Sequence, residues 1–178
     1  LAIFSFALNF VLFGESPASF HIVNIILNAI AVFLVFALVL KLFGDKNLAL
    51  FSALLFAFLP IHTEAVASIK SRDEILAAIF SLSSWLVFIR STEKEINYKG
   101  IILSSFLFLL AILSKETFIL SPLIFLAVLF VQKKAGFKHI FEIVLLFTPA
   151  SLVYFWMRIK SLGMFAFGAS QDDFTTNP

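Results

Sequence analysis

The chain alternates apolar runs with short polar clusters, and this alternation limits what it can fold into. Hydrophobic residues make up 61% of its 178 residues and charged residues 13%, against about 45–50% and about 25% in a soluble domain. An apolar segment at Leu1–Phe13 is followed by six runs, which are roughly His21–Phe43, Leu48–Pro60, Ile75–Ile89, Ile101–Leu113, Phe118–Val131 and Ile140–Met157. We therefore predict an all-α integral membrane protein, a polytopic bundle of about six spanning helices.

Four of these runs are shorter than a membrane crossing requires. A spanning helix needs about 20 residues, and only His21–Phe43 and Ile140–Met157 approach that length. Core helices of a soluble protein would be the alternative, but four in succession with so few charges make it improbable. We expect instead that each helix extends into the polar motif beside it. Charged groups at that depth lie around a water-filled cavity rather than against lipid.

The distribution of basic residues predicts an orientation. One side of the membrane would receive eight lysines and arginines and the other side five, so the positive-inside rule places the first side in the cytoplasm. The eight are Lys41, Lys46, Arg90, Lys94, Lys99, Lys133, Lys134 and Lys138, and the five are Lys70, Arg72, Lys115, Arg158 and Lys160. On either orientation, the polar clusters that contain His62, Arg72 and Lys115 would share one face.

The segment Leu1–Phe13 is predicted to be a short helix, with Ser5 and Asn9 four residues apart on one side. Gly14 is suited to end it. The helix would either lie flat at the outer membrane interface or form the end of a spanning helix, and the sequence does not decide between the two.

The cluster after Pro60 holds His62 and Glu64. A proline there breaks or kinks the preceding helix. The two side chains would hydrogen-bond a sugar or phosphate, or Glu64 would transfer a proton. A solvated interfacial loop is the alternative.

In the next cluster, Ser71 and Glu74 fit a capping box, and Asp73 suits a helix N-terminus. These residues therefore have a structural explanation. A cation at a helix start opposes the helix dipole, so capping does not explain Arg72, whose forked guanidinium suits phosphate or carboxylate binding.

The third cluster, Ser114-Lys115-Glu116-Thr117, forms a tight turn between two apolar runs. Lys115 would bind an anionic lipid phosphate with Glu116 orienting it. A local Lys115–Glu116 pair, with Ser114 as a cap, is the structural alternative. Snorkelling at the interface explains Arg158 and Lys160 adequately.

Several classes of site find no support in the sequence. Without cysteine there is no thiol or zinc-thiolate chemistry. The net charge of +2 gives no reason to expect nucleic acid as a partner. Asp172-Asp173 is weak evidence for a metal site, because no further ligand is nearby. Tyr154, Trp85 and Trp156 are interpreted as packing or interface residues.

Four motifs occur here in the order and approximate spacing of one known family. They are Phe20-His21-Ile22-Val23-Asn24-Ile25-Ile26-Leu27, Leu55–Ile69 with His62-Thr63-Glu64-Ala65-Val66, Arg72–Ala77, and Leu113-Ser114-Lys115-Glu116-Thr117. The chain resembles the transmembrane and tetratricopeptide-repeat-containing protein O-mannosyltransferases and their bacterial relatives, which belong to the GT-C superfamily of membrane glycosyltransferases. The resemblance covers nearly the whole chain.

This resemblance implies an inverting enzyme that transfers a sugar, typically mannose, from a polyprenyl phosphate to an acceptor hydroxyl of a protein or a glycan on the extracytoplasmic side. Fixed cations would stabilise the charge that grows on the departing lipid phosphate. Arg72, Lys115 and Arg158 are the candidates for this role. His62, Glu64, Asp73 and Glu116 would bind or orient substrate, and neither a metal nor a cofactor is expected.

The catalytic acid of the family lies in the first outer loop, which would precede Leu1. Residues 1–178 would then be a fragment that is inactive alone, and Glu64 is only a weak candidate for the base. We expect residues 1–19 to end that outer loop with the interfacial helix, residues 20–158 to be the six-helix part of a GT-C transmembrane domain, and residues 159–178 to begin an extracytoplasmic segment.

Two other functions are alternatives, and the first of them would also place charges in a membrane cavity. A transporter or flippase for a lipid-linked sugar should show comparable polar groups on both faces or at mid-membrane, and a non-catalytic scaffold should tolerate alanine in the clusters. For the location, we expect a bacterial inner membrane rather than the endoplasmic reticulum.

Overall fold

A computed structural model describes residues 1–59, 68, 71–93, 97–131 and 137–162 of the chain. Its regular elements in these residues are all helical. They are α1 (Ala2–Phe13), α2 (Pro17–Phe43), α3 (Lys46–Phe58), α5 (Arg72–Thr92), α6 (Tyr98–Ser114), the 3-10 helix η2 (Glu116–Leu120), α7 (Ser121–Val131) and α8 (Phe137–Leu162). The prediction of an all-α chain is confirmed for this part of the molecule.

The helix ends follow local sequence signals. Gly14 and Gly44 end α1 and α2 with positive φ angles of 69° and 74°, a conformation that side chains with a Cβ rarely adopt. The carboxylate of Asp45 caps α3 by accepting the backbone N–H groups of Asn47 at 2.8 Å and Leu48 at 3.3 Å. The predicted termination of α1 at Gly14 is therefore confirmed.

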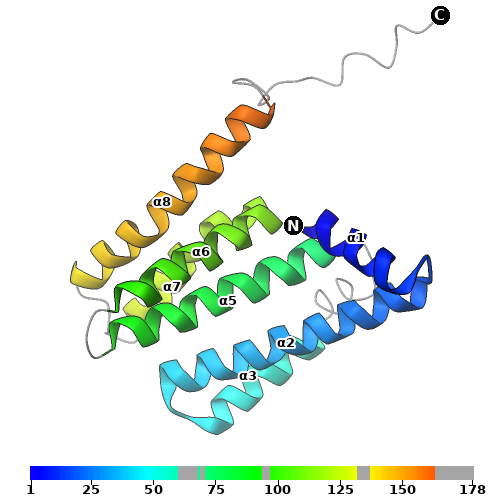
Figure 1. Ribbon diagram of the computed structural model, residues 1–178. Coiled ribbons are helices and arrows are strands. Elements are labelled where there is room, and N and C mark those ends of the chain that lie inside the picture. Colours follow the sequence, from blue (N-terminus) through cyan, green and yellow to red (C-terminus); the bar gives the residue numbers. More distant parts are fainter. Residues whose placement is uncertain (60–67, 69–70, 94–96, 132–136, 163–178) are drawn as a thin grey trace, which may run out of the picture.

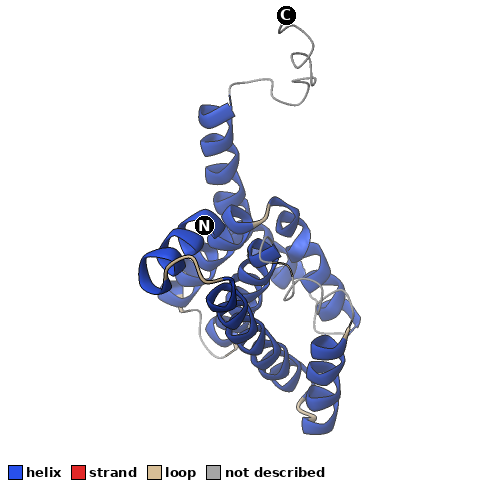
Figure 2. Cartoon of the chain, turned by 90° about the vertical axis from the view of Figure 1, so that its right-hand side faces the viewer, coloured by secondary structure: helices blue, strands red, loops and turns tan. Residues whose placement is uncertain are grey.

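The long helices run up and down in alternation, as Figure 1 shows. In lateral order, α3 packs on α2, α2 on α5, α5 on α6, and α6 on α8, while α7 contacts α8. Helix α1 crosses the N-terminal ends of α2 and α5. The view turned by 90° in Figure 2 shows the same helices more nearly end-on. Because of this alternation, the first turns of α5 and the last turns of α6 and α8 lie toward the same end.

Small polar side chains allow α5 and α6 to approach closely. Ser84 and Ser104 are both fully buried, and each hydroxyl donates to the other residue's carbonyl oxygen at 2.8 Å. A Cβ added to Gly100 would lie 2.0 Å from Ser91 Oγ, so this glycine leaves room for the neighbouring helix. Small residues and interhelical hydrogen bonds are how helices associate in lipid, where burial of apolar surface supplies little driving force.

Aromatic rings fill the space between α5, α6, α7 and α8. Phe108 meets Phe147 edge-on with ring centroids 4.4 Å apart, and Trp85 stacks on Phe125 at 5.0 Å. Phe88 contacts both Phe125 and Phe147. The interpretation of Trp85 as a packing residue is confirmed, although its indole nitrogen has no hydrogen-bond partner among the described residues.

Within the described residues, two helices are long and apolar enough to cross a membrane, namely α2 and α5. The shorter apolar helices cover Ala2–Phe13, Lys46–Phe58, Tyr98–Ser114 and Glu116–Phe130. The structure is therefore consistent with a helical membrane protein, and the count of six spans stays a prediction. Large apolar side chains on α1 point outward, with Ile3 85% and Val11 79% exposed, as an interfacial or lipid-facing helix requires.

Helices α5 and α6 extend beyond their apolar runs, as expected from the shortness of those runs, whereas α3 ends at Phe58, before Pro60, and α7 begins at Ser121, after Phe118. Helix α5 begins at Arg72 rather than Ile75, and α6 covers Tyr98–Ser114 rather than Ile101–Leu113. The capping box predicted at Ser71 and Glu74 is wrong. Ser71 has φ −80° and ψ 12°, away from the extended backbone of an N-cap, and its side chain makes no capping hydrogen bond.

Replacing Gly100 by leucine should destabilise the protein by about 1–3 kcal/mol, because the new side chain would force α5 and α6 apart. Thermal unfolding in detergent micelles measures the loss. Ser91→Gly in the same chain should recover part of it, because it removes the two Ser91 side-chain atoms that would lie nearest to a Cβ at position 100. Equal unfolding temperatures for wild type and Gly100→Leu would contradict the close approach of the helices.

Candidate functional site

The centre of the site is an ion pair between helices far apart in the sequence. Lys115, which follows the last residue of α6, directs its ammonium group to the carboxylate of Glu74 in the first turn of α5. The side chains remain 29% and 44% exposed, respectively. A pair of this kind at membrane depth satisfies both charges while leaving them accessible to a third group.

This pair faces a cavity of about 200 Å³. Besides Lys115 and Glu74, the described residues that line this cavity include two neutral polar ones, Asn28 of α2 and Thr117 of η2. The apolar lining is Ala31, Phe56, Ile75, Ala78 and Phe118. A second cavity of about 300 Å³ shares Phe56, Ala78, Thr117 and Phe118 with the first and is lined mainly by apolar side chains. A cavity whose described lining includes the Lys115 cation therefore adjoins a more apolar cavity.

The neighbouring acid, Glu116, pairs in a different direction. Its carboxylate contacts the guanidinium of Arg158, near the C-terminal end of α8, and accepts the hydroxyl of Tyr154 at 3.1 Å. Arg158 in turn donates to the Tyr154 oxygen at 2.6 Å. The local Lys115–Glu116 pair considered from the sequence is thus replaced by two pairs to distant helices. Tyr154, expected only to pack, is part of this polar contact.

Arg72 occupies a closed environment. Its side chain is fully buried, and all three guanidinium nitrogens donate hydrogen bonds. The acceptors are Asn24 Oδ1 at 2.7 Å, Asn9 Oδ1 at 3.1 Å, and the carbonyl oxygens of Ser5 at 3.3 Å and Phe20 at 3.1 Å. The guanidinium carbon also lies 4.5 Å from the ring centroid of Phe6.

Arg72 therefore fastens α1 to α2 and α5, and it does not line the cavity beside Lys115. Its oxygen partners in the described residues are neutral, so the buried cation is satisfied by hydrogen bonds and aromatic faces rather than by a carboxylate. This geometry gives the residue a structural task. The expectation that it binds the donor phosphate has no support from its contacts and stays a prediction.

The other residues that the sequence proposed for a site either lie outside the described residues or make local contacts. His62, Glu64 and the Asp172-Asp173 pair lie outside the described residues. Asp73 accepts the backbone N–H of Glu74 at 2.9 Å and is not among the residues that line the cavity. Ser114 donates to the Leu110 carbonyl oxygen at 2.9 Å, so its hydroxyl bonds its own helix and caps no following one. Among described residues, no group of three His, Cys, Asp or Glu side chains could hold a metal ion.

Sequence reasoning missed Glu74 and Asn28 as site residues. Glu74 has the spacing of a capping box, and that local explanation hid its long-range partner. A usable signal existed for Asn28. It lies four residues after Asn24 in an otherwise apolar helix, so both amides fall on one face of α2. Asn24 is fully buried against Arg72, and Asn28 lines the cavity.

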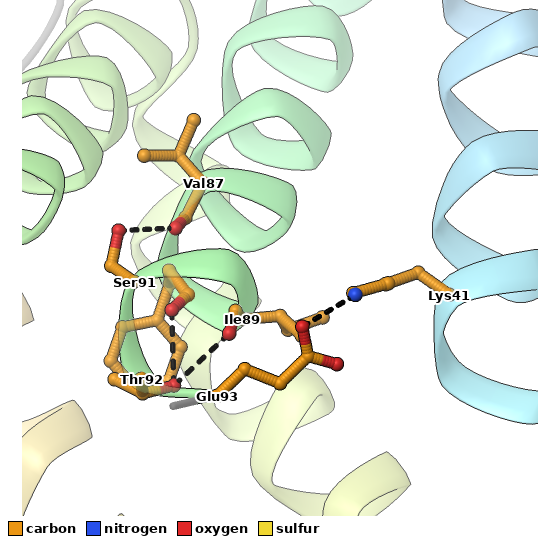
Figure 3. A network of polar contacts seen from close by, with 7 residues as sticks. Lys41, Val87, Ile89, Ser91, Thr92 and Glu93 are labelled. Atoms are coloured by element: carbon orange, nitrogen blue, oxygen red, sulfur yellow. Dashed lines mark hydrogen bonds and ion pairs between the residues drawn. The ribbon is translucent and has the colours of Figure 1, made fainter. Parts of the chain in front are cut away.

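The opposite end of the bundle carries a comparable pair that serves as a reference. Figure 3 shows Lys41 of α2 reaching across to Glu93, with Nζ and Oε2 2.5 Å apart. Beside it, the hydroxyls of Ser91 and Thr92 donate to carbonyl oxygens of their own helix. The side chains of Lys41 and Glu93 are 32% and 51% exposed, close to the values for Lys115 and Glu74.

Apolar helices with paired charges around a cavity at one end define a helical membrane protein with an internal polar site. The profile of the dolichyl-phosphate-mannose-protein mannosyltransferase family matches residues 1–158. The chain therefore belongs to this family, as the sequence motifs indicated.

Curated relatives agree with the family assignment. Protein O-mannosyl-transferase TMTC3 from Homo sapiens is 40% identical over 118 residues, which are 65% of this chain and 13% of that protein. Protein O-mannosyl-transferase TMTC1 from Homo sapiens is 38% identical over 127 residues, 66% of this chain and 14% of that protein. Protein O-mannosyl-transferase F38B6.6 from Caenorhabditis elegans is 39% identical over 116 residues, 64% of this chain and 16% of that protein. The matched part of this chain thus spans about one seventh of each relative, and no solved structure matches.

Replacing Arg72 by alanine should release α1 from α2 and α5, because it removes every hydrogen bond of the guanidinium. The chain has no cysteine, so labelling of a single Ser5→Cys variant reports on this contact. Labelling should accelerate several-fold with Arg72→Ala and remain at the Ser5→Cys rate with Arg90→Ala, an exposed arginine at the other end of α5. Equal rates in all three proteins would show that α1 is held by other contacts.

Proposed function

We propose that this chain forms part of an enzyme that transfers mannose from a polyprenyl phosphate to a hydroxyl group of a protein. Lys115 would hold the lipid phosphate and stabilise the negative charge that develops there as the bond to the sugar breaks. The observation that carries this proposal is the partly exposed Lys115 side chain at the wall of a cavity, next to a more apolar cavity. The names of the relatives, which are protein O-mannosyl-transferases, support the sugar and the acceptor.

The paired cavities suit a donor that has a polar head and an apolar tail. A phosphate group next to Lys115 would place an attached isoprenoid chain along the chamber lined by Leu82, Ile124 and their neighbours. Transfer by displacement would invert the sugar configuration, as expected for the GT-C class. Charge on the departing phosphate would be met by Lys115, and we propose that no metal is required.

Arg158 would contribute indirectly. Its guanidinium pairs with Glu116, the residue next to Lys115, and donates a hydrogen bond to the Tyr154 hydroxyl. The pair therefore supports the backbone of the turn from which Lys115 projects. Binding of the donor phosphate by Arg158 itself, and substrate orientation by Glu116 and Asp73, stay predictions. His62 and Glu64 keep their proposed contacts with substrate and acceptor.

The location of the site relative to the membrane is part of the proposal. On the orientation indicated by the basic residues, the end that carries Lys115 faces away from the cytoplasm. The relatives reported above come from human and worm, so the expected bacterial inner membrane has no support from them.

Replacing Lys115 by methionine in the full-length protein should lower kcat/KM for mannose transfer by about 10²–10³, because a preorganised cation is lost where charge develops. Because the Lys115 side chain is partly exposed, the temperature of thermal unfolding should change little. Lys41→Met is the matched control, because it breaks the equivalent ion pair at the other end of the bundle. Undiminished transfer by Lys115→Met would remove this residue from the mechanism.

Single cysteines should report the orientation. A membrane-impermeant thiol reagent added from the extracytoplasmic side should label Thr117→Cys, whose native residue is exposed, and should leave Tyr98→Cys unmodified. Permeabilised membranes, in which both positions should react, provide the control. The reverse pattern would place the cavity on the cytoplasmic side.

A further inference from the structure

The position that a donor phosphate would take beside Lys115 is already held by a carboxylate. Glu74 reaches the Lys115 ammonium from α5 and lines the same cavity. A carboxylate resembles one edge of a phosphate in charge and in its acceptor oxygens. Binding of a lipid phosphate must therefore displace Glu74 from Lys115 or share the ammonium with it.

We propose that Glu74 is a built-in competitor of the lipid phosphate, which weakens binding of the product lipid phosphate and thereby speeds its release. This inference rests on the proposed function, since it requires that Lys115 bind the phosphate. It adds a positioning residue that sets the balance between holding the donor and releasing the product.

The charges of donor and product explain why a competitor is useful. The donor is a phosphodiester with a single negative charge. Transfer breaks the bond between the sugar and the phosphate oxygen, and it forms a bond from the sugar to the acceptor oxygen, whose proton passes to a base. The lipid is left as a phosphomonoester with a charge of about −1.5 to −2 near neutral pH. A lone lysine would hold this product more tightly than the donor. A fixed carboxylate beside the lysine opposes this, because it repels the product more strongly than it repels the donor.

Geometry singles out Glu74 among the acids at this end. Glu116 is adjacent to Lys115 in sequence, but its carboxylate is engaged by Arg158 and Tyr154 on α8. Asp73 is bonded to the backbone N–H of Glu74 and does not line the cavity. In the described part of the lining, the other polar residues, Asn28 and Thr117, are neutral. Among described residues, Glu74 is therefore the acid whose carboxylate lies both on Lys115 and in the cavity.

The fold keeps Glu74 close to Lys115. It stands in the first turn of α5, two residues after Arg72, whose buried hydrogen bonds hold that turn against α1 and α2. A flexible carboxylate would move away when phosphate arrives, and its repulsion would fade. Because the first turn of α5 is anchored, the side chain can rotate off Lys115 but its backbone remains beside the cavity.

The test is Glu74→Gln in the full-length protein reconstituted in lipid nanodiscs, since glutamine keeps the shape and removes the charge. Polyprenyl phosphate without sugar is the binding probe. We expect it to bind about tenfold more tightly to Glu74→Gln than to wild type, because one nearby negative charge is removed. In steady-state mannose transfer, KM for the lipid donor and kcat should both fall, and inhibition by added polyprenyl phosphate should strengthen.

Two further variants separate the possible failures. Glu93→Gln neutralises the acid of the matched pair at the opposite end and should leave the binding constant at its wild-type value. Lys115→Met should weaken probe binding. If Lys115→Met binds the probe as wild type does, the proposed function itself fails. The competitor proposal is overturned if Lys115→Met weakens binding of the probe but Glu74→Gln binds the probe no more tightly than wild type does. Lys115 then keeps its role, and Glu74 is left as a residue that orients the lysine.

Discussion

An unpaired charge next to hydrocarbon is costly, and this constraint governs how one end of the bundle is assembled. Lys115 finds its partner on α5 and Glu116 finds its partner on α8. Two adjacent residues thereby connect helices that begin more than 60 residues apart in the sequence. The turn after α6 is held from both sides, and the cavity beside Lys115 is lined by residues of α2, α3, α5 and η2.

Two cations at this end satisfy the same constraint in contrasting ways. Arg72 is fully buried, and its nitrogens are occupied by amide and carbonyl oxygens of α1 and α2. Lys115 is half exposed and shares a cavity wall with its carboxylate partner. A closed network of neutral acceptors is difficult to exchange, so it suits a structural role. An accessible ion pair can be exchanged for another anion, so it suits a binding role.

The contrast between these cations also shows how far the sequence predicted the site. The sequence identified Arg72, Lys115 and Arg158 as candidate phosphate-binding cations, but it did not predict which of them is buried in a closed hydrogen-bond network. The environment of Arg72 depends on Asn9 and Asn24, which lie 63 and 48 residues away in the sequence. Glu74 was assigned to a cap because its spacing from Ser71 satisfied a local rule. Only a contact with Lys115, 41 residues away, revealed its other role.

The sequence by itself determined the helical class and the placement of Arg72 and Lys115 toward one end, because these follow from apolar run length and from the alternation of successive helices. Its motifs determined the family. The close contact of α5 with α6 and the choice of ionic partners were decided only by the tertiary structure. Side-chain periodicity specifies which face of a helix is polar, but it does not specify the rotation and axial position of one helix against another. Those two quantities determine whether Lys115 meets Glu116 or Glu74, and packing across the whole bundle sets them.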